Sequence, residues 1–267
     1  MAHIEHTRAV VEAQEMYDGR IIPSEQAEID RPVRLRADAT VRGSVYGGTV
    51  EANEGATVEG SVMASEGIEI DGAHVAGEVG TPDKVTATGA RVDGTVTGTR
   101  VRLTDCVVRG NVVGSEVILE NCVVLGIATA DRSLTAENSL CYTVRAEGQV
   151  TADELTLVLP QAIMKGEIDL QSPVAVAGLG SIDVAGDTDE RLPKMDADDL
   201  YEEGDNTYLT LAPRILNIEK VTDRLSELED AVMTAVDDTS DDDGTEMSVE
   251  DVLDHLEVDS EQIGPIS

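Results

Sequence analysis

The sequence has no tryptophan and no phenylalanine among its 267 residues, and five tyrosines are its only aromatic residues. Large aromatic side chains normally supply much of the volume of a wide hydrophobic core. Their scarcity favours a narrow interior filled by small and medium aliphatic side chains.

Basic residues are also scarce. The chain has 19 Lys and Arg against 54 Asp and Glu, a net charge of −35, and residues 187–267 alone hold 26 acids and five bases. Nucleic acids and anionic membranes are bound by basic patches, so this balance argues against both as partners. Acidic surfaces of this kind are typical of adaptation to high salt, which screens self-repulsion, and a dedicated cation-binding role is the alternative.

Long apolar segments are missing as well. No run approaches the ~20 residues of a membrane helix, and the first ten residues lack the apolar segment of a signal peptide. Three cysteines, an odd number, suit a reducing compartment better than a disulfide framework. We therefore expect a cytoplasmic protein without a transmembrane segment. The sequence contains no GxxxxGK[ST] phosphate loop, so it gives no indication that a nucleotide drives assembly.

What the sequence does contain is a repeat. The sequence ATVRGSV at 39–45 is repeated as ATVEGSV at 56–62, and the glycine in this motif recurs at spacings of 17, 17, 17, 16 and 16 residues. A short fixed period indicates one repeated structural unit. We expect the glycines to lie at corners, because glycine tolerates a positive φ. They are Gly43, Gly60, Gly77, Gly94, Gly110 and Gly126.

Each unit alternates apolar and polar residues. Ala39, Val41 and Val45 share one parity, and the polar residues between them share the other. This period of two predicts a strand with one buried face. Strands this short are not stable alone. They become stable when each repeat forms one coil around an axis and its strands hydrogen-bond to those of the next coil, ~4.8 Å away. The chain is therefore predicted to be all-β, a single-stranded parallel β-helix.

The repeat also divides the chain. It begins near residue 33, and strand-like patterns continue to about residue 186, which predicts about nine coils of 16–17 residues over 33–186. Residues 1–32 are expected to form an arm, partly helical at 7–17, and residues 187–213 an acidic linker. Apolar residues then recur every three or four positions from Ile215 to Val232, predicting an acidic helical region over 214–267.

Two surfaces are candidate interfaces. The first coil is expected to expose unpaired backbone groups and to serve as a polymerisation interface. Its residues are Val33, Leu35, Val41, Val45 and Val50. Outward positions become apolar in later coils and need a cover, which the predicted C-terminal helix or a neighbouring protomer would supply. This strip and its helical partner comprise Val107, Val123, Leu125, Ile127, Leu225 and Leu228.

Reactive residues are few. His74 is the one histidine within the repeat, and we interpret it as solvated; His3 and His6 lack a third ligand. Cys106 and Cys122 share one column, so stacking would bring them within about 5 Å of each other. We interpret them as small core residues rather than as a disulfide or a soft-metal site. No catalytic, cofactor or metal site is expected, and the protein is expected not to be an enzyme.

The Val-x-Gly-x-Val coils of about 17 residues resemble those of the bactofilins, which are polymer-forming cytoskeletal proteins. The acidic composition is similar to that of their halophilic archaeal relatives, the halofilins. The resemblance covers about residues 33–186 and implies a right-handed, triangular β-helix that polymerises end to end without nucleotide. It further implies a scaffold for cell shape or spatial organisation, with cytoskeletal or envelope-associated partners and membrane association through them. Bactofilin cores use a phenylalanine near one end, which this chain lacks.

The alternative is a hexapeptide-repeat acyltransferase or its carbonic-anhydrase relative, with a left-handed β-helix. Their coils have 18 residues, and the anhydrase needs three histidines as metal ligands. Here the period is 16–17, the glycines follow polar or variable residues such as Arg42, Glu59 and Asp93, and His74 is the one histidine in the repeat. An adhesin-like extracellular β-helix is disfavoured by the missing signal peptide.

Overall fold

The computed structural model describes residues 3–5, 8–22, 31–158, 161–172, 174–176, 200–203 and 206–210, together with residues 226, 230 and 234. It divides into two compact units, residues 1–119 and residues 120–267. Each unit is described by itself.

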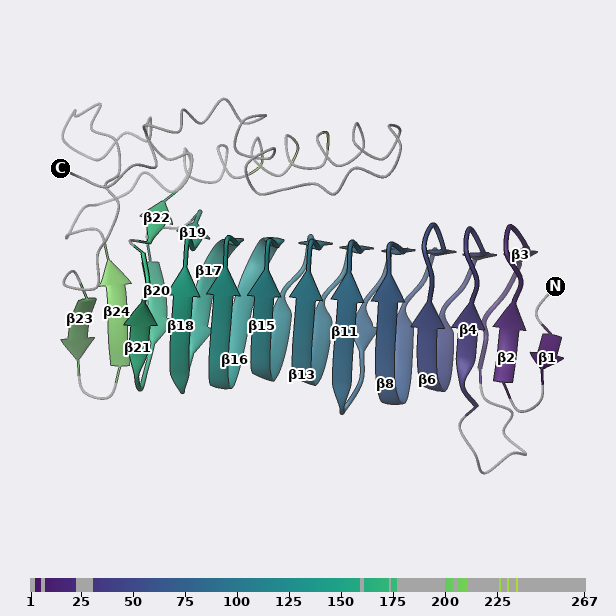
Figure 1. The fold of residues 1–267 in the computed structure, drawn as a ribbon, viewed down its shortest axis with the longest axis horizontal. Coiled ribbons are helices and arrows are strands. Elements are labelled where there is room, and N and C mark those ends of the chain that lie inside the picture. The colour runs from purple at the N-terminus through teal and green to yellow at the C-terminus, as the bar shows by residue number, and fades with distance from the viewer. Residues whose placement is uncertain are drawn as a thin grey trace. The chain divides into compact units, whose positions relative to one another are not determined.

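The first unit consists of short strands joined by tight turns (Figure 1). In chain order they are β1 (His3–Glu5), β2 (Arg8–Val11), β3 (Met16–Tyr17), β4 (Val33–Leu35), β5 (Thr40–Val41), β6 (Val45–Ala52), β7 (Thr57–Val58), β8 (Val62–Asp71), β9 (His74–Val75), β10 (Val79–Gly80), β11 (Lys84–Thr88), β12 (Arg91–Val92), β13 (Val96–Thr104), β14 (Val107–Val108) and β15 (Val112–Glu120).

These strands stack on three faces. Face A contains the strands in register with Val33–Leu35, face B those in register with Thr40–Val41, and face C those in register with Val45–Gly47. From β4 onward within this unit, the paired strands are parallel, and partner residues lie 16 to 18 positions apart. The predicted parallel β-helix is confirmed. The longest spacing follows an irregularity between Gly47 and Thr49, where one strand gains a residue.

The interior is as narrow as the missing aromatics predict. One column consists of Ala39, Ala56, Ala73 and Ala90, each at most 2 % exposed. Branched aliphatic side chains from the other strands surround it, and burying each of these contributes roughly 1.5–3 kcal/mol. They include Leu35, Val41, Val58, Ile70, Val75, Val92 and Leu103.

The recurrent glycines have a different role from the one predicted. None of the six has a positive φ; a regular series of positive φ values occurs at another corner, with 71°, 60° and 57° at Gly55, Gly72 and Gly89, and Gly19, which lies against Gly43, has a φ of 137°. A Cβ atom at Gly94 would lie 2.5 Å from the backbone oxygen of Gly77 in the coil before, closer than any side chain tolerates. The repeat therefore requires glycine because adjacent coils approach closely at this corner, not because φ is positive there.

Residues 8–22 form a further coil instead of the expected arm. Ala9 pairs with Val33, Met16 with Thr40, and Ile21 with Val45, all in parallel register. Val11 is fully buried and Ile21 is 7 % exposed, and both pair with interior residues of the next coil, so these two aliphatic side chains extend the core. The ladder thus begins before residue 33. β1 then pairs with the outer edge of β2 in the antiparallel direction, and the two arrows are opposed in Figure 1.

The second unit continues the same parallel pattern. Leu134 pairs with Val150 and Val150 with Ile168, while Leu140 pairs with Thr156. Its strands are β16 (Val123–Glu137), β17 (Leu140–Ala146), β18 (Gln149–Asp153), β19 (Thr156–Leu157), β20 (Gln161–Met164), β21 (Ile168–Leu170), β22 (Ala175–Val176), β23 (Leu200–Glu203) and β24 (Asn206–Thr210).

This ladder also ends on reversed strands. β24 pairs antiparallel with β20, and β23 pairs antiparallel with β24. Residues 200–203 and 206–210 are therefore strands, although they lie in the segment predicted to be an acidic linker. Of the predicted helical region, the structure describes Ser226, Asp230 and Thr234, which are helical and exposed.

Candidate functional site: the outer edges of the strand ladders

The outer edge of β2 is a row of backbone donors and acceptors. The Ala9 N–H donates to the Pro32 carbonyl at 2.9 Å, and the Arg36 N–H donates to the Val11 carbonyl at 3.0 Å, both on the β4 side. Because backbone groups alternate along a strand, those of Arg8 and Val10 face the opposite edge. β1 lies on that edge, with Glu5 opposite Arg8 and His3 opposite Val10.

The outer edge of β20 is arranged in the same way. The N–H of Lys165, directly after β20, donates to the Ala146 carbonyl at 2.8 Å. The backbone groups of Ala162 and Met164 therefore face away from β17. Leu209 and Thr207 of β24 lie opposite them. Unpaired strand edges are templates for further strands, and in each unit a reversed strand occupies this template.

The predicted polymerisation residues do not lie on such an edge. The side chains of Val33, Leu35, Val41, Val45 and Val50 are at most 2 % exposed and belong to the interior. Their strands are paired on both sides, since β2, β3 and Ile21 precede them. The prediction that this coil is the terminal one is wrong, because the coil of residues 8–22 comes before it.

The predicted apolar strip is mostly buried. Val107 in the first unit is 6 % exposed, and in the second unit Val123 and Leu125 are 1 % and 9 % exposed. Ile127 is the exposed member, at 39 %. Leu225 and Leu228 lie outside the described residues, so docking of the C-terminal helix stays a prediction.

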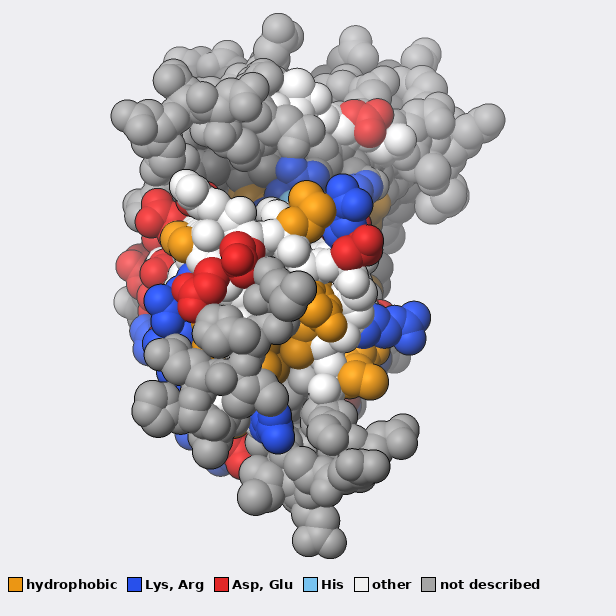
Figure 2. Space-filling model, turned by 90° about the vertical axis from the view of Figure 1, so that its right-hand side faces the viewer, with side chains coloured by type: hydrophobic (Ala, Val, Ile, Leu, Met, Phe, Trp, Pro, Cys, Tyr) orange, Lys and Arg blue, Asp and Glu red, His pale blue; other side chains and the backbone are white. Residues whose placement is uncertain are grey.

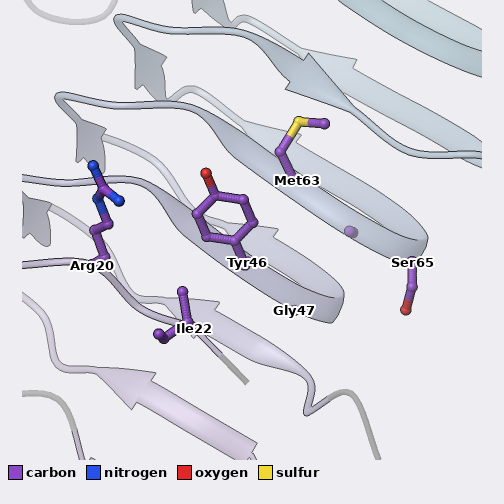
Figure 3. A pocket seen from close by; sticks show the side chains of 7 residues that line it. Arg20, Ile22, Tyr46, Gly47, Met63 and Ser65 are labelled. Carbon is purple, nitrogen blue, oxygen red and sulfur yellow. The ribbon is translucent and has the colours of Figure 1, made fainter. Parts of the chain in front are cut away.

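A shallow groove runs along face C of the first unit. It encloses about 490 Å³ and is lined by Arg20, Ile22, Tyr46, Met63 and their neighbours (Figure 3). A second hollow of about 380 Å³ shares Met63 and Ala64 with it. Seen from the side of β1–β3, hydrophobic side chains gather near the middle of the surface, among acidic and basic ones (Figure 2). The groove combines apolar side chains with the guanidinium of Arg20 and the hydroxyls of Tyr46 and Ser65.

His74 is paired, which the sequence did not indicate. Its Nε2 lies 2.9 Å from Asp93 Oδ2, and Arg91 Nε donates to Asp93 Oδ1 at 3.0 Å. Burial raises the pKa of Asp93, but the hydrogen bonds and charges of His74 and Arg91 outweigh it, so this pKa lies below its ordinary value. His74 and Arg91 occupy the same position in adjacent coils. The cluster therefore links two coils, and only knowledge of their register could have predicted it.

The cysteines are free and buried. The thiols of Cys106 and Cys122 donate to the carbonyls of Thr104 and Glu120, each at 3.2 Å. Burial raises the pKa of Cys141 to about 12. Because the thiolate is the reactive and metal-binding form, Cys141 is inert at neutral pH. Within the described residues, no group of three or more His, Cys, Asp or Glu side chains is arranged to hold a metal ion.

No protein-family model matches this chain, and neither a curated protein nor a solved structure matches it. Among the helices that the structure describes, none combines the length and apolar character needed to cross a bilayer.

Proposed function

We propose that this protein is a non-enzymatic, polymer-forming scaffold that assembles with copies of itself through the ends of its β-helix. One observation supports the proposal above the others. The chain builds a parallel ladder whose coils pair in nearly constant register, and the backbone edge of such a ladder can accept a further coil from another copy. Growth of this kind needs no nucleotide.

The reactive side chains fit a structural role. His74 and Arg91 hold Asp93 between two coils, and the three cysteines are buried in the interior. The proposed setting is the cytoplasm of a salt-adapted cell, because the net charge of −35 is best tolerated where ions screen it. There the scaffold would contribute to cell shape or spatial organisation, in the manner of the bactofilins, with envelope-associated proteins as further partners.

The test is sedimentation velocity of the full chain over a wide range of concentrations at molar salt, with negative-stain electron microscopy of the same samples. We expect elongated assemblies whose size grows with protein concentration and does not depend on added nucleotide. A compact trimer that does not elongate would favour the acyltransferase or carbonic-anhydrase alternative. The proposal would be contradicted if the protein stayed monomeric at every concentration, both as the wild type and in variants whose ladder edges are uncovered.

A further inference from the structure

The reversed strands at the two ladder edges share one geometric property. From β4 onward the first unit is built from parallel pairs, yet β1 runs antiparallel to β2. In the second unit β24 runs antiparallel to β20, and β23 to β24. A coil from another copy that continued either ladder would pair in parallel with β2 or β20, and these two edges are already occupied.

β1 offers a weaker template than the edge of β2 that it covers. In β1, His3 and Glu5 lie opposite Val10 and Arg8, whose backbone groups face β1. Of the three residues of β1, only Ile4 therefore directs its backbone N–H and C=O away from β2. A very short edge strand is one way in which natural proteins prevent strand addition. β1 has three residues, whereas β23 and β24 have four and five, so β1 is held by fewer pairs.

We propose that β1 and the β23–β24 hairpin are displaceable caps, and that the covered edges of β2 and β20 are the surfaces to which a second copy adds. This inference rests on the proposed function and specifies how assembly is controlled. Binding through a covered edge is weakened by the fraction of molecules whose cap is open, so a cap open in about one molecule in ten weakens it about tenfold. The shorter cap, β1, opens more readily.

Proline substitutions distinguish a cap from a contact. Glu5→Pro removes the N–H that faces β2, whereas Ile4→Pro, its matched control, removes an N–H that faces away. At the other ladder, Leu209→Pro removes the N–H that faces β20, and its control Glu202→Pro removes an N–H directed away from β24. Circular dichroism and a thermal melt check that each variant keeps its β structure.

The readout is the concentration at which half of the protein sediments as assemblies. We expect Glu5→Pro and Leu209→Pro to lower it by about tenfold or more, and the two controls to leave it at the wild-type value. Assembly of the cap variants at the wild-type concentration or above would overturn the inference. If the wild type assembles and Ile4→Pro prevents this, the outer edge of β1 is itself the contact; the inference then fails and the proposed function stands. If no variant assembles, both fail.

A reversible lock gives a test that does not depend on removing a hydrogen bond. Ile4 and Ala9 are directly opposite each other at a non-hydrogen-bonded pair, where Cα atoms lie about 4.5 Å apart, within reach of a disulfide. In the double variant Ile4→Cys with Ala9→Cys, oxidation should fix β1 on β2 and prevent assembly through the β2 edge, and reduction should restore it. Equal assembly of the oxidised and reduced forms would overturn the inference.

Discussion

At the scale of single residues, the glycines that reveal the repeat are needed for space between coils. The sequence shows their period but not the distance between adjacent coils. We therefore explained the glycines by a positive φ at a corner and not by close approach of the two backbones. The structure places the left-handed conformation at a different corner, which Asp38, Gly55, Gly72, Gly89 and Asp105 occupy in turn. At that corner a small or hydrogen-bonding side chain suffices, because Asp and Asn tolerate positive φ better than other residues do.

Replacing one of the recurrent glycines should therefore lower the stability of the fold, even though φ at these glycines is not positive. Gly94→Ala would place a Cβ 2.5 Å from the Gly77 backbone oxygen, whereas at the control position Gly67 the nearest atom, the Lys84 oxygen, is 3.5 Å away. We expect Gly94→Ala to lower the free energy of unfolding by about 1–3 kcal/mol and Gly67→Ala to leave it nearly unchanged. Denaturant unfolding of both variants measures the difference, and equal stabilities would contradict the close-approach explanation.

The Asp93 cluster predicts a pH-dependent stability. Because the pKa of Asp93 is lowered in the folded state by His74 and Arg91, its contribution is present above the ordinary value of about 3.9. That contribution is lost as the pH falls through the lowered pKa. Asp93→Asn should cost about 1 kcal/mol at pH 7 and little near pH 2, measured by urea unfolding at both.

The matched control is Asp83→Asn. Asp83 pairs with Arg100 at 3.2 Å, but both side chains are 56 % exposed, and exposed pairs of this kind contribute little. We expect a small effect at both pH values. The explanation fails if Asp93→Asn costs the same near pH 2 as at pH 7.

At the scale of secondary-structure elements, the sequence predicted the strands wherever the repeat is regular. Alternation around Val41 and Val58 places one face inside, and the constant spacing sets the register. The coil of residues 8–22 was missed because Ala9 and Val33 are 24 positions apart, so the period is broken before it is established. One motif signal was nevertheless present, because Gly19 and Ile21 match the Gly-x-Val pattern, and Gly19 lies against Gly43 of the next coil.

The β23–β24 hairpin was missed for another reason. Acidic residues such as Glu202 and Glu203 gave the segment the composition of a linker, and composition does not reveal pairing. One local signal was present: Gly204 and Asp205 separate two short runs that contain tyrosines. Glycine next to aspartate is common in tight hairpin turns. The candidate site depends on these reversed strands, so repeat analysis alone could not have located it.

At the scale of the whole molecule, charge should govern stability. With 54 acidic against 19 basic residues, repulsion acts over about 30 Å at 0.01 M salt and over about 3 Å at 1 M. We expect the melting temperature to rise steadily with potassium chloride across this range. An uncharged osmolyte at matched osmolality is the control, because it favours burial without screening charge. Equal melting temperatures at low and high salt would show that charge repulsion does not limit this fold.

The register of face A makes length a property that can change in whole steps. Lys84 occupies the position that Gly67 holds one coil earlier, so excising residues 67–83 would join Glu66 to Lys84 with every later strand still in phase. Each such step alters the ladder by one strand spacing, ~4.8 Å. Duplication or loss of a coil therefore changes the length of this ladder in steps of one coil and leaves the pairing of the remaining strands unchanged.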